Sequence, residues 1–137
     1  MIKFKSTVRL KTFSPAIRHI LDTMQKYLYE FYFPYEEGPL PEDIVITSIN
    51  DGKHSANSRH FTDEAVDVRS RNFQNRAAKL MFRKKLEWVL NWYGAYYFHD
   101  KFRVLFEKTL KDENGKVTRT EHFHIQVKKG VKLCLSR

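Results

Sequence analysis

Apolar side chains recur along the N-terminal part of the chain at the spacing of an amphipathic helix. Ser14 and Pro15 indicate where this helix starts, because serine caps free amide groups and proline suits the first helical turn. Pro34 ends the pattern. The face predicted to pack on the core comprises Ile17, Leu21, Met24, Leu28 and Phe31.

A second amphipathic helix is predicted from Asn72 to about Tyr93, and Gly94 is the residue type expected to end it. Its buried face comprises Ala78, Phe82, Leu86, Val89 and Tyr93. Its charged flank comprises Arg76, Lys79, Arg83 and Glu87.

Four segments have the composition of strands. The first two are 43–48, rich in β-branched residues, and 65–69; between them, residues 50–58 read as a polar loop. The other two are 101–110 and 117–127, which an Asn-Gly turn joins as a hairpin. These elements predict an α+β domain in which two main helices pack on a small, mainly antiparallel sheet.

The last predicted strand separates its side chains by type. Because alternate residues point to opposite faces, Phe123 and Ile125 belong to the core face, whereas His122 and His124 share the other face. Two histidines on one strand face are either a solvated polar surface or part of a functional site.

Composition and charge set bounds on the class of protein. The chain has 137 residues, which fits one domain over 1–137, expected to be a monomer. Its net charge of +9 predicts attraction to polyanions, among which nucleic acid, anionic lipid and bacterial cell wall all qualify. The single Cys134 excludes an internal disulfide.

Neither a signal peptide nor a membrane span is expected. Met1–Lys5 is not followed by an apolar signal core, and no stretch approaches the length of a spanning helix. We therefore expect synthesis in the cytoplasm, and a protein of this kind that acts outside it would need another route of delivery.

Two short segments carry the candidate chemistry: Ser58-x-His60-x6-Asp67 and Glu121-x-x-His124. Imidazole nitrogens and carboxylate oxygens are donors that zinc accepts, and a catalytic zinc keeps three protein ligands and one open position. Asp67 lies in an apolar setting, so it requires a cationic partner. Arg69 on the same strand face and a metal ion are the two alternatives.

In these segments the chain resembles the zinc peptidases of the D-alanyl-D-alanine carboxypeptidase and dipeptidase group, which includes small phage endolysins and shares its fold with the Hedgehog signalling domain. The resemblance spans roughly residues 44–127. It implies that His60, Asp67 and His124 bind Zn²⁺, that Glu121 is the general base, and that the substrate is a peptide of bacterial peptidoglycan. The activity would be that of a carboxypeptidase or an endopeptidase.

Two further expectations concern the surroundings of this site. On a straight strand Glu121 faces away from His124, because their offset is three, so a turn or bulge is predicted just before His122. The family commonly has an arginine after the strand that precedes the ligand loop, and this chain has none there. Lys53, Arg59 and His54 are the candidates to replace this arginine in binding substrate. His122, His54 and Ser58 are proposed to support the ligands.

Two other functions compete with the peptidase. The missing arginine favours a non-catalytic metal-binding module, for example a phage particle component, whereas the retained Glu121 favours catalysis. His122-Phe123-His124 also matches the His-hydrophobic-His signature of nucleases that nick single-stranded DNA through a tyrosine. In those enzymes the tyrosine helix follows the histidine strand, and no tyrosine follows His124 here, so nucleic acid is the less favoured partner.

Overall fold

The centre of the fold is a five-stranded sheet with the strand order β1-β2-β3-β7-β4. The computed structural model describes residues 1–8, 15–28, 40–50, 64–92 and 102–127. β1 (Ile2–Phe4) runs parallel to β2 (Ile44–Asn50). β3 (Ala65–Arg69), β7 (His122–Val127) and β4 (Phe102–Glu107) continue the sheet, and every pairing among β2, β3, β7 and β4 is antiparallel. The predicted α+β class with a mainly antiparallel sheet is confirmed, whereas β1 was not predicted.

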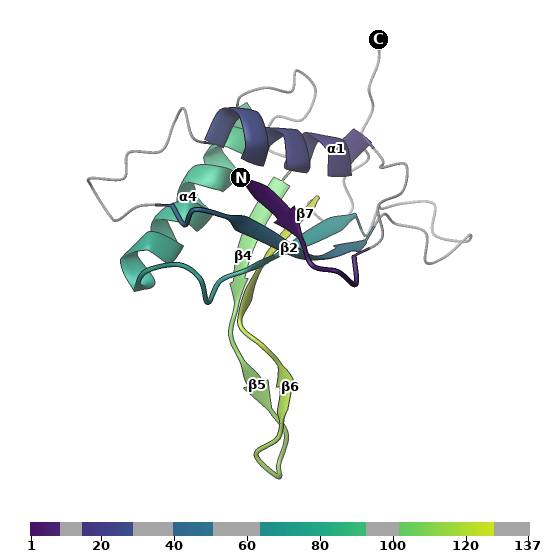
Figure 1. Ribbon diagram of the computed structural model, residues 1–137, viewed down its shortest axis with the longest axis vertical. Coiled ribbons are helices and arrows are strands. Elements are labelled where there is room, and N and C mark those ends of the chain that lie inside the picture. Colours follow the sequence, from purple (N-terminus) through teal and green to yellow (C-terminus); the bar gives the residue numbers. More distant parts are fainter. Residues whose placement is uncertain (9–14, 29–39, 51–63, 93–101, 128–137) are drawn as a thin grey trace.

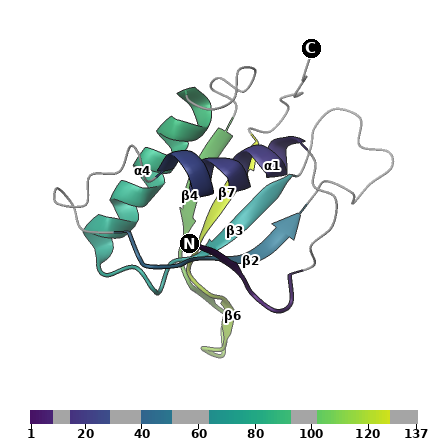
Figure 2. The ribbon, with the colours of Figure 1, turned by 45° about the horizontal axis from the view of Figure 1, so that its top comes forward.

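Helices cover one face of this sheet (Figures 1 and 2). They are α1 (Pro15–Asp22), which continues into the π-helical turn η1 (Thr23–Tyr27), and α4 (Arg76–Trp92). An apolar core lies between the helices and the sheet, where burial of large side chains supplies most of the stabilisation. Its largest fully buried side chains include Phe82, Phe102, Phe123, Ile17, Ile20 and Met24.

The first helix differs in detail from its sequence pattern. Ile17, Met24 and Leu28 are fully buried as predicted, but Ile20 is buried where the pattern placed Leu21, which is only partly buried. The Leu28 amide donates to the carbonyl of Thr23, five residues earlier. Such a wide turn shifts the angular position of the side chains that follow it. The predicted extension to Pro34 lies outside the described residues.

The second helix begins later than predicted. Asn75 accepts a hydrogen bond at 2.8 Å from the Ala78 amide through its side-chain oxygen, the geometry of a helix cap. The helix therefore starts at Arg76 and not at Asn72. Its predicted buried face is confirmed at Ala78, Phe82, Leu86 and Val89, while Tyr93 and Gly94 lie outside the described residues.

Polar side chains of α4 bind the free edge of the sheet. Asn91 accepts from the Phe102 amide at 2.8 Å and donates to the Phe102 carbonyl at 3.0 Å. Glu87 accepts from the Val104 amide at 2.8 Å. An uncovered edge strand presents open hydrogen-bonding groups to other chains. The helix therefore both buries one sheet face and protects β4, the neighbour of the histidine strand.

Beyond β4 the chain forms an arm that projects from the body of the protein (Figure 1). The arm consists of β5 (Leu110–Lys111) and β6 (Val117–Arg119), which pair antiparallel. The predicted Asn-Gly turn is confirmed, with Gly115 at a φ of 82°, a conformation that glycine adopts without strain. Pairing is interrupted between Arg119 and His122, so the predicted long strand 117–127 is divided into β6 and β7.

No helix within the described ranges is long and apolar enough to cross a membrane.

Candidate metal centre

Asp67 from the first candidate segment and His124 from the second meet on the sheet face that the helices leave open. Asp67 on β3 and His124 on β7 are opposite each other in the strand register. His124 Nδ1 donates to Asp67 Oδ1 at 2.7 Å, although 57 residues separate them. The cationic partner expected for Asp67 is therefore His124, and the described residues show no ion pair between Asp67 and Arg69.

His122 completes a group of three donors on this face. One ligand atom from each of Asp67, His122 and His124 lies within 4.8 Å of the others. His122 Nδ1 donates to the Thr120 carbonyl at 2.7 Å, which leaves Nε2, beside Glu107 and Asp67, as the nitrogen available to a metal. A histidine oriented in this way is prepared to bind a metal.

The local electrostatics also fit a metal site. The pKa of His124 is raised, first because of its hydrogen bond to Asp67, while partial burial acts in the opposite direction. A ligating imidazole must lose this proton, so metal and proton compete for His124. Two imidazoles and one carboxylate form a donor set that zinc accepts. The structure therefore supports a metal-binding group without identifying the metal.

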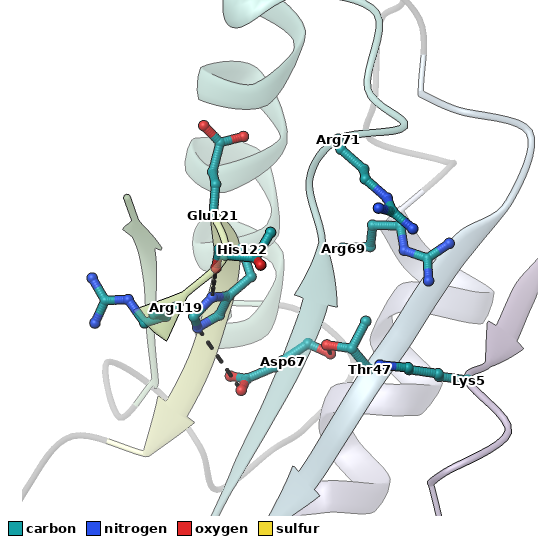
Figure 3. A pocket seen from close by; sticks show the side chains of 9 residues that line it. Lys5, Thr47, Asp67, Arg69, Arg71, Arg119, Glu121 and His122 are labelled. Atoms are coloured by element: carbon teal, nitrogen blue, oxygen red, sulfur yellow. Dashed lines mark hydrogen bonds and ion pairs between the residues drawn. The ribbon is translucent and has the colours of Figure 1, made fainter. Parts of the chain in front are cut away.

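Glu121, expected to be the general base, is held elsewhere. Ser70 Oγ donates to Glu121 Oε2 at 2.6 Å, and Lys79 Nζ on α4 donates to the same oxygen at 2.8 Å. These bonds lower the pKa of Glu121, the Lys79 bond most strongly. Figure 3 shows the Glu121 carboxylate directed away from Asp67 and His122. A break in the strand does precede His122, but in this structure the break directs Glu121 toward the helix layer.

Another carboxylate adjoins the donor group in its place. Glu107 Oε1 on β4 lies 3.0 Å from His122 Nε2, and Asp67 Oδ2 lies 3.8 Å from the same nitrogen. Glu107 is opposite His122 in the register of β4 and β7. The sequence contained a signal for this residue, because alternation from the buried Phe102 and Val104 places Glu107 on the open face.

The remaining predicted site residues lie outside the described residues. They are the proposed ligand His60 and the proposed supporting residues His54, Ser58, Arg59 and Lys53. Glu64 is the first described residue after this segment, and β3 with Asp67 follows directly. Two of the three predicted ligands, Asp67 and His124, therefore lie within the described residues.

A cavity of about 340 Å³ adjoins the donor group and includes Asp67 and His122 in its lining. Its lining also contains cations from three parts of the chain: Lys5 after β1, Arg69 and Arg71 at the end of β3, and Arg119 from β6. In the view of Figure 3, Lys5, Arg69 and Arg71 lie on one side of the cavity and Arg119 on the other. Sequence reasoning did not assign these cations to the site, because only the sheet brings them together.

Comparisons of the chain with protein-family models, with curated proteins and with solved structures found no match. The fold and the candidate site therefore rest on the sequence and the structure of this chain alone.

Proposed function

We propose that this protein is a zinc-dependent peptidase that hydrolyses peptides of bacterial peptidoglycan and has a fold of the Hedgehog and D-alanyl-D-alanine peptidase type. The observation that carries the proposal is the contact of Asp67 with His124 on the open face of the sheet. The motif resemblance required these two residues to converge on one ion, and they are direct neighbours.

In the proposed site, Asp67 and His124 bind zinc, and His60 from the segment before β3 is the third ligand. A bound zinc ion polarises a carbonyl group and makes water nucleophilic at neutral pH. The Thr120 carbonyl holds the His122 ring in place, so that Nε2 faces Asp67 and Glu107. His122 then either orients the ligands or replaces His60 as the third one.

Proton transfer requires a carboxylate that reaches the reacting water. Glu121 can act as the general base only after it turns from Lys79 and Ser70, because these contacts hold its carboxylate away from Asp67 and His122. Glu107 already adjoins His122 without such a rearrangement. The lowered pKa of Glu121 also makes it a weaker proton acceptor, since a base works best with a pKa near the working pH.

The position of Glu121 favours a second candidate function, a metal-binding module without catalysis. In that case the carboxylate serves only to join β7 to α4 through Lys79. Such a protein binds zinc but leaves peptidoglycan intact. Both functions therefore predict bound zinc, but only the peptidase predicts hydrolysis of peptidoglycan.

Metal analysis of the purified protein, combined with mass spectrometry of digested peptidoglycan, tests site and reaction together. We expect about one zinc ion per chain and peptide products with a newly formed terminus. Asp67→Asn should lose the metal, whereas Asp22→Asn, an exposed position on α1, should retain it. Folded protein without metal would refute the site, and metal-loaded protein without products would favour the binding module.

Three variants then assign the remaining roles. If His60 is the third ligand, His60→Ala should abolish zinc binding, and His122→Ala should weaken it only about 10- to 100-fold, as for a residue that supports a ligand. The reverse order would make His122 the ligand. Hydrolysis that persists in Glu121→Gln and disappears in Glu107→Gln would move the base to Glu107.

A further inference from the structure

Two pairs of an imidazole and a carboxylate lie next to each other on the open face of the sheet. His124 on β7 is opposite Asp67 on β3, and His122 on β7 is opposite Glu107 on β4. His124 Nδ1 donates to Asp67 Oδ1 at 2.7 Å, and His122 Nε2 lies 3.0 Å from Glu107 Oε1. Each of the two imidazoles therefore has a carboxylate of its own, and the two carboxylates come from opposite sides of β7.

Asp67 connects the two pairs. Its Oδ1 atom contacts His124, while its Oδ2 atom lies 3.8 Å from His122 Nε2. In Figure 3 the Asp67 carboxylate is directed toward the His122 ring. A carboxylate placed in this way can bind a different ion through each oxygen. Hydrolases with paired metal sites, aminopeptidases among them, hold their two ions about 3.5–4 Å apart.

We propose that the protein has a second cation site, formed by Glu107, His122 and the Oδ2 atom of Asp67, beside the zinc ion of the proposed function. The inference rests on that function, in which Asp67 Oδ1, His124 and His60 are the ligands of the first ion. His122 and Glu107 then remain as a donor pair that the first ion does not use. Asp67 bridges the two ions.

The donor set selects the chemical class of the second ion. One imidazole and two carboxylates suit zinc, cobalt or manganese, whereas calcium and magnesium favour oxygen ligands. The Thr120 carbonyl orients the His122 ring through Nδ1, so Nε2 faces the site. The side chains of His122, Asp67 and Glu107 are 15%, 26% and 31% exposed, which leaves water access to the open coordination positions.

Nearby positive charge makes the second site weaker than the first. Arg119 Nη1 lies 3.7 Å from Glu107 Oε1, and Arg69 and Arg71 line the adjoining cavity. These cations and the first zinc ion repel another dication. We therefore expect the purified protein to retain the first ion, and the second ion to bind when free zinc is added.

The competing arrangement is one ion shared by Asp67, His122 and His124, whose ligand atoms lie within 4.8 Å of one another. His122 Nε2 is closer to Glu107 than to Asp67. A shared ion has its three ligands without Glu107, whereas the second ion requires this carboxylate. Replacement of Glu107 therefore distinguishes the two arrangements.

Equilibrium dialysis against increasing free Zn²⁺, followed by elemental analysis, counts the ions bound per chain. We expect about one ion at low free zinc and about two at high free zinc. Glu107→Gln should retain the first ion and weaken the second by more than about 100-fold, because a direct ligand contributes more than the 10- to 100-fold of a residue that supports one. His122→Gln should also lose the second ion. Glu113→Gln, at an exposed carboxylate in the turn between β5 and β6, should retain both.

Cobalt distinguishes a bridged pair of ions from zinc bound elsewhere on the surface. A bridging carboxylate couples the spins of two Co²⁺ ions. The electron paramagnetic resonance signal per ion should therefore fall when the second Co²⁺ binds to the full chain. Glu107→Gln should not show this loss, and circular dichroism of each variant reports whether the fold is retained.

The outcomes separate the second site from the proposed function. One ion per chain at every zinc concentration, a second ion that persists in both folded variants, or an undiminished signal with two Co²⁺ ions would each overturn the second site. Peptidoglycan hydrolysis by protein with one ion would overturn the second site and leave the peptidase in place. Two coupled ions without hydrolysis would support the second site and refute the peptidase.

Discussion

Asn91 offers the sharpest test of how the sheet edge beside the site is stabilised. Its side chain is only 6% exposed and makes two hydrogen bonds with the main chain of Phe102, at 2.8 and 3.0 Å. A typical hydrogen bond contributes about 0.5–1.5 kcal/mol net, so Asn91→Ala should lower the free energy of unfolding by roughly 1–3 kcal/mol. Burial of the affected groups favours the upper end of this range, because water cannot replace the lost bonds.

Urea denaturation followed by tryptophan fluorescence measures this loss. Both tryptophans, Trp88 and Trp92, lie on α4, the helix that carries Asn91. Asn72→Ala is the matched control, since Asn72 donates one exposed hydrogen bond to the Asp43 carbonyl. An unchanged dependence on urea concentration would show that only stability was altered. A loss for Asn91→Ala no larger than that for Asn72→Ala would refute the proposed role of the edge contact.

Three further predictions concern titrating groups. Burial lowers the pKa of His19, so the free energy of unfolding should fall as the pH drops below about 6.5 and level off below the folded-state pKa. Urea titrations at several pH values measure this dependence, and His19→Gln should remove it. Lys79→Met should raise the pKa of Glu121, which NMR titration measures. If Glu121 is the base, the pH below which the rate of hydrolysis falls should also rise in this variant. Because Asp67 raises the pKa of His124, zinc affinity should increase and proton release should decrease from pH 6 to pH 8 in calorimetry.

Each of these predictions has a contrary result. A stability that depends equally on pH in His19→Gln and the unmodified chain would remove the role of His19. An unchanged Glu121 titration in Lys79→Met would mean that the contact is absent in solution. Zinc affinity independent of pH would exclude His124 as a ligand.

The sequence by itself determined the elements around the site and the faces of their side chains. Alternation in His122–Val127 and the helical spacing of Ala78, Phe82 and Leu86 are local properties, because each follows from the geometry of one strand or one helix. The proximity of Asp67 and His124 was also expected, although from the family resemblance and not from periodicity, whereas their direct hydrogen bond was not expected.

Only the tertiary structure decided which charges meet. Glu121 faces Lys79 because a break in the strand and the position of α4 together set its direction, and no local pattern contains both. Glu107 reaches His122 through strand register. Lys5 enters the cavity because β1 adds to the edge of β2, far away in sequence. Periodicity specifies a face, whereas register, strand breaks and layer packing specify the neighbours on that face.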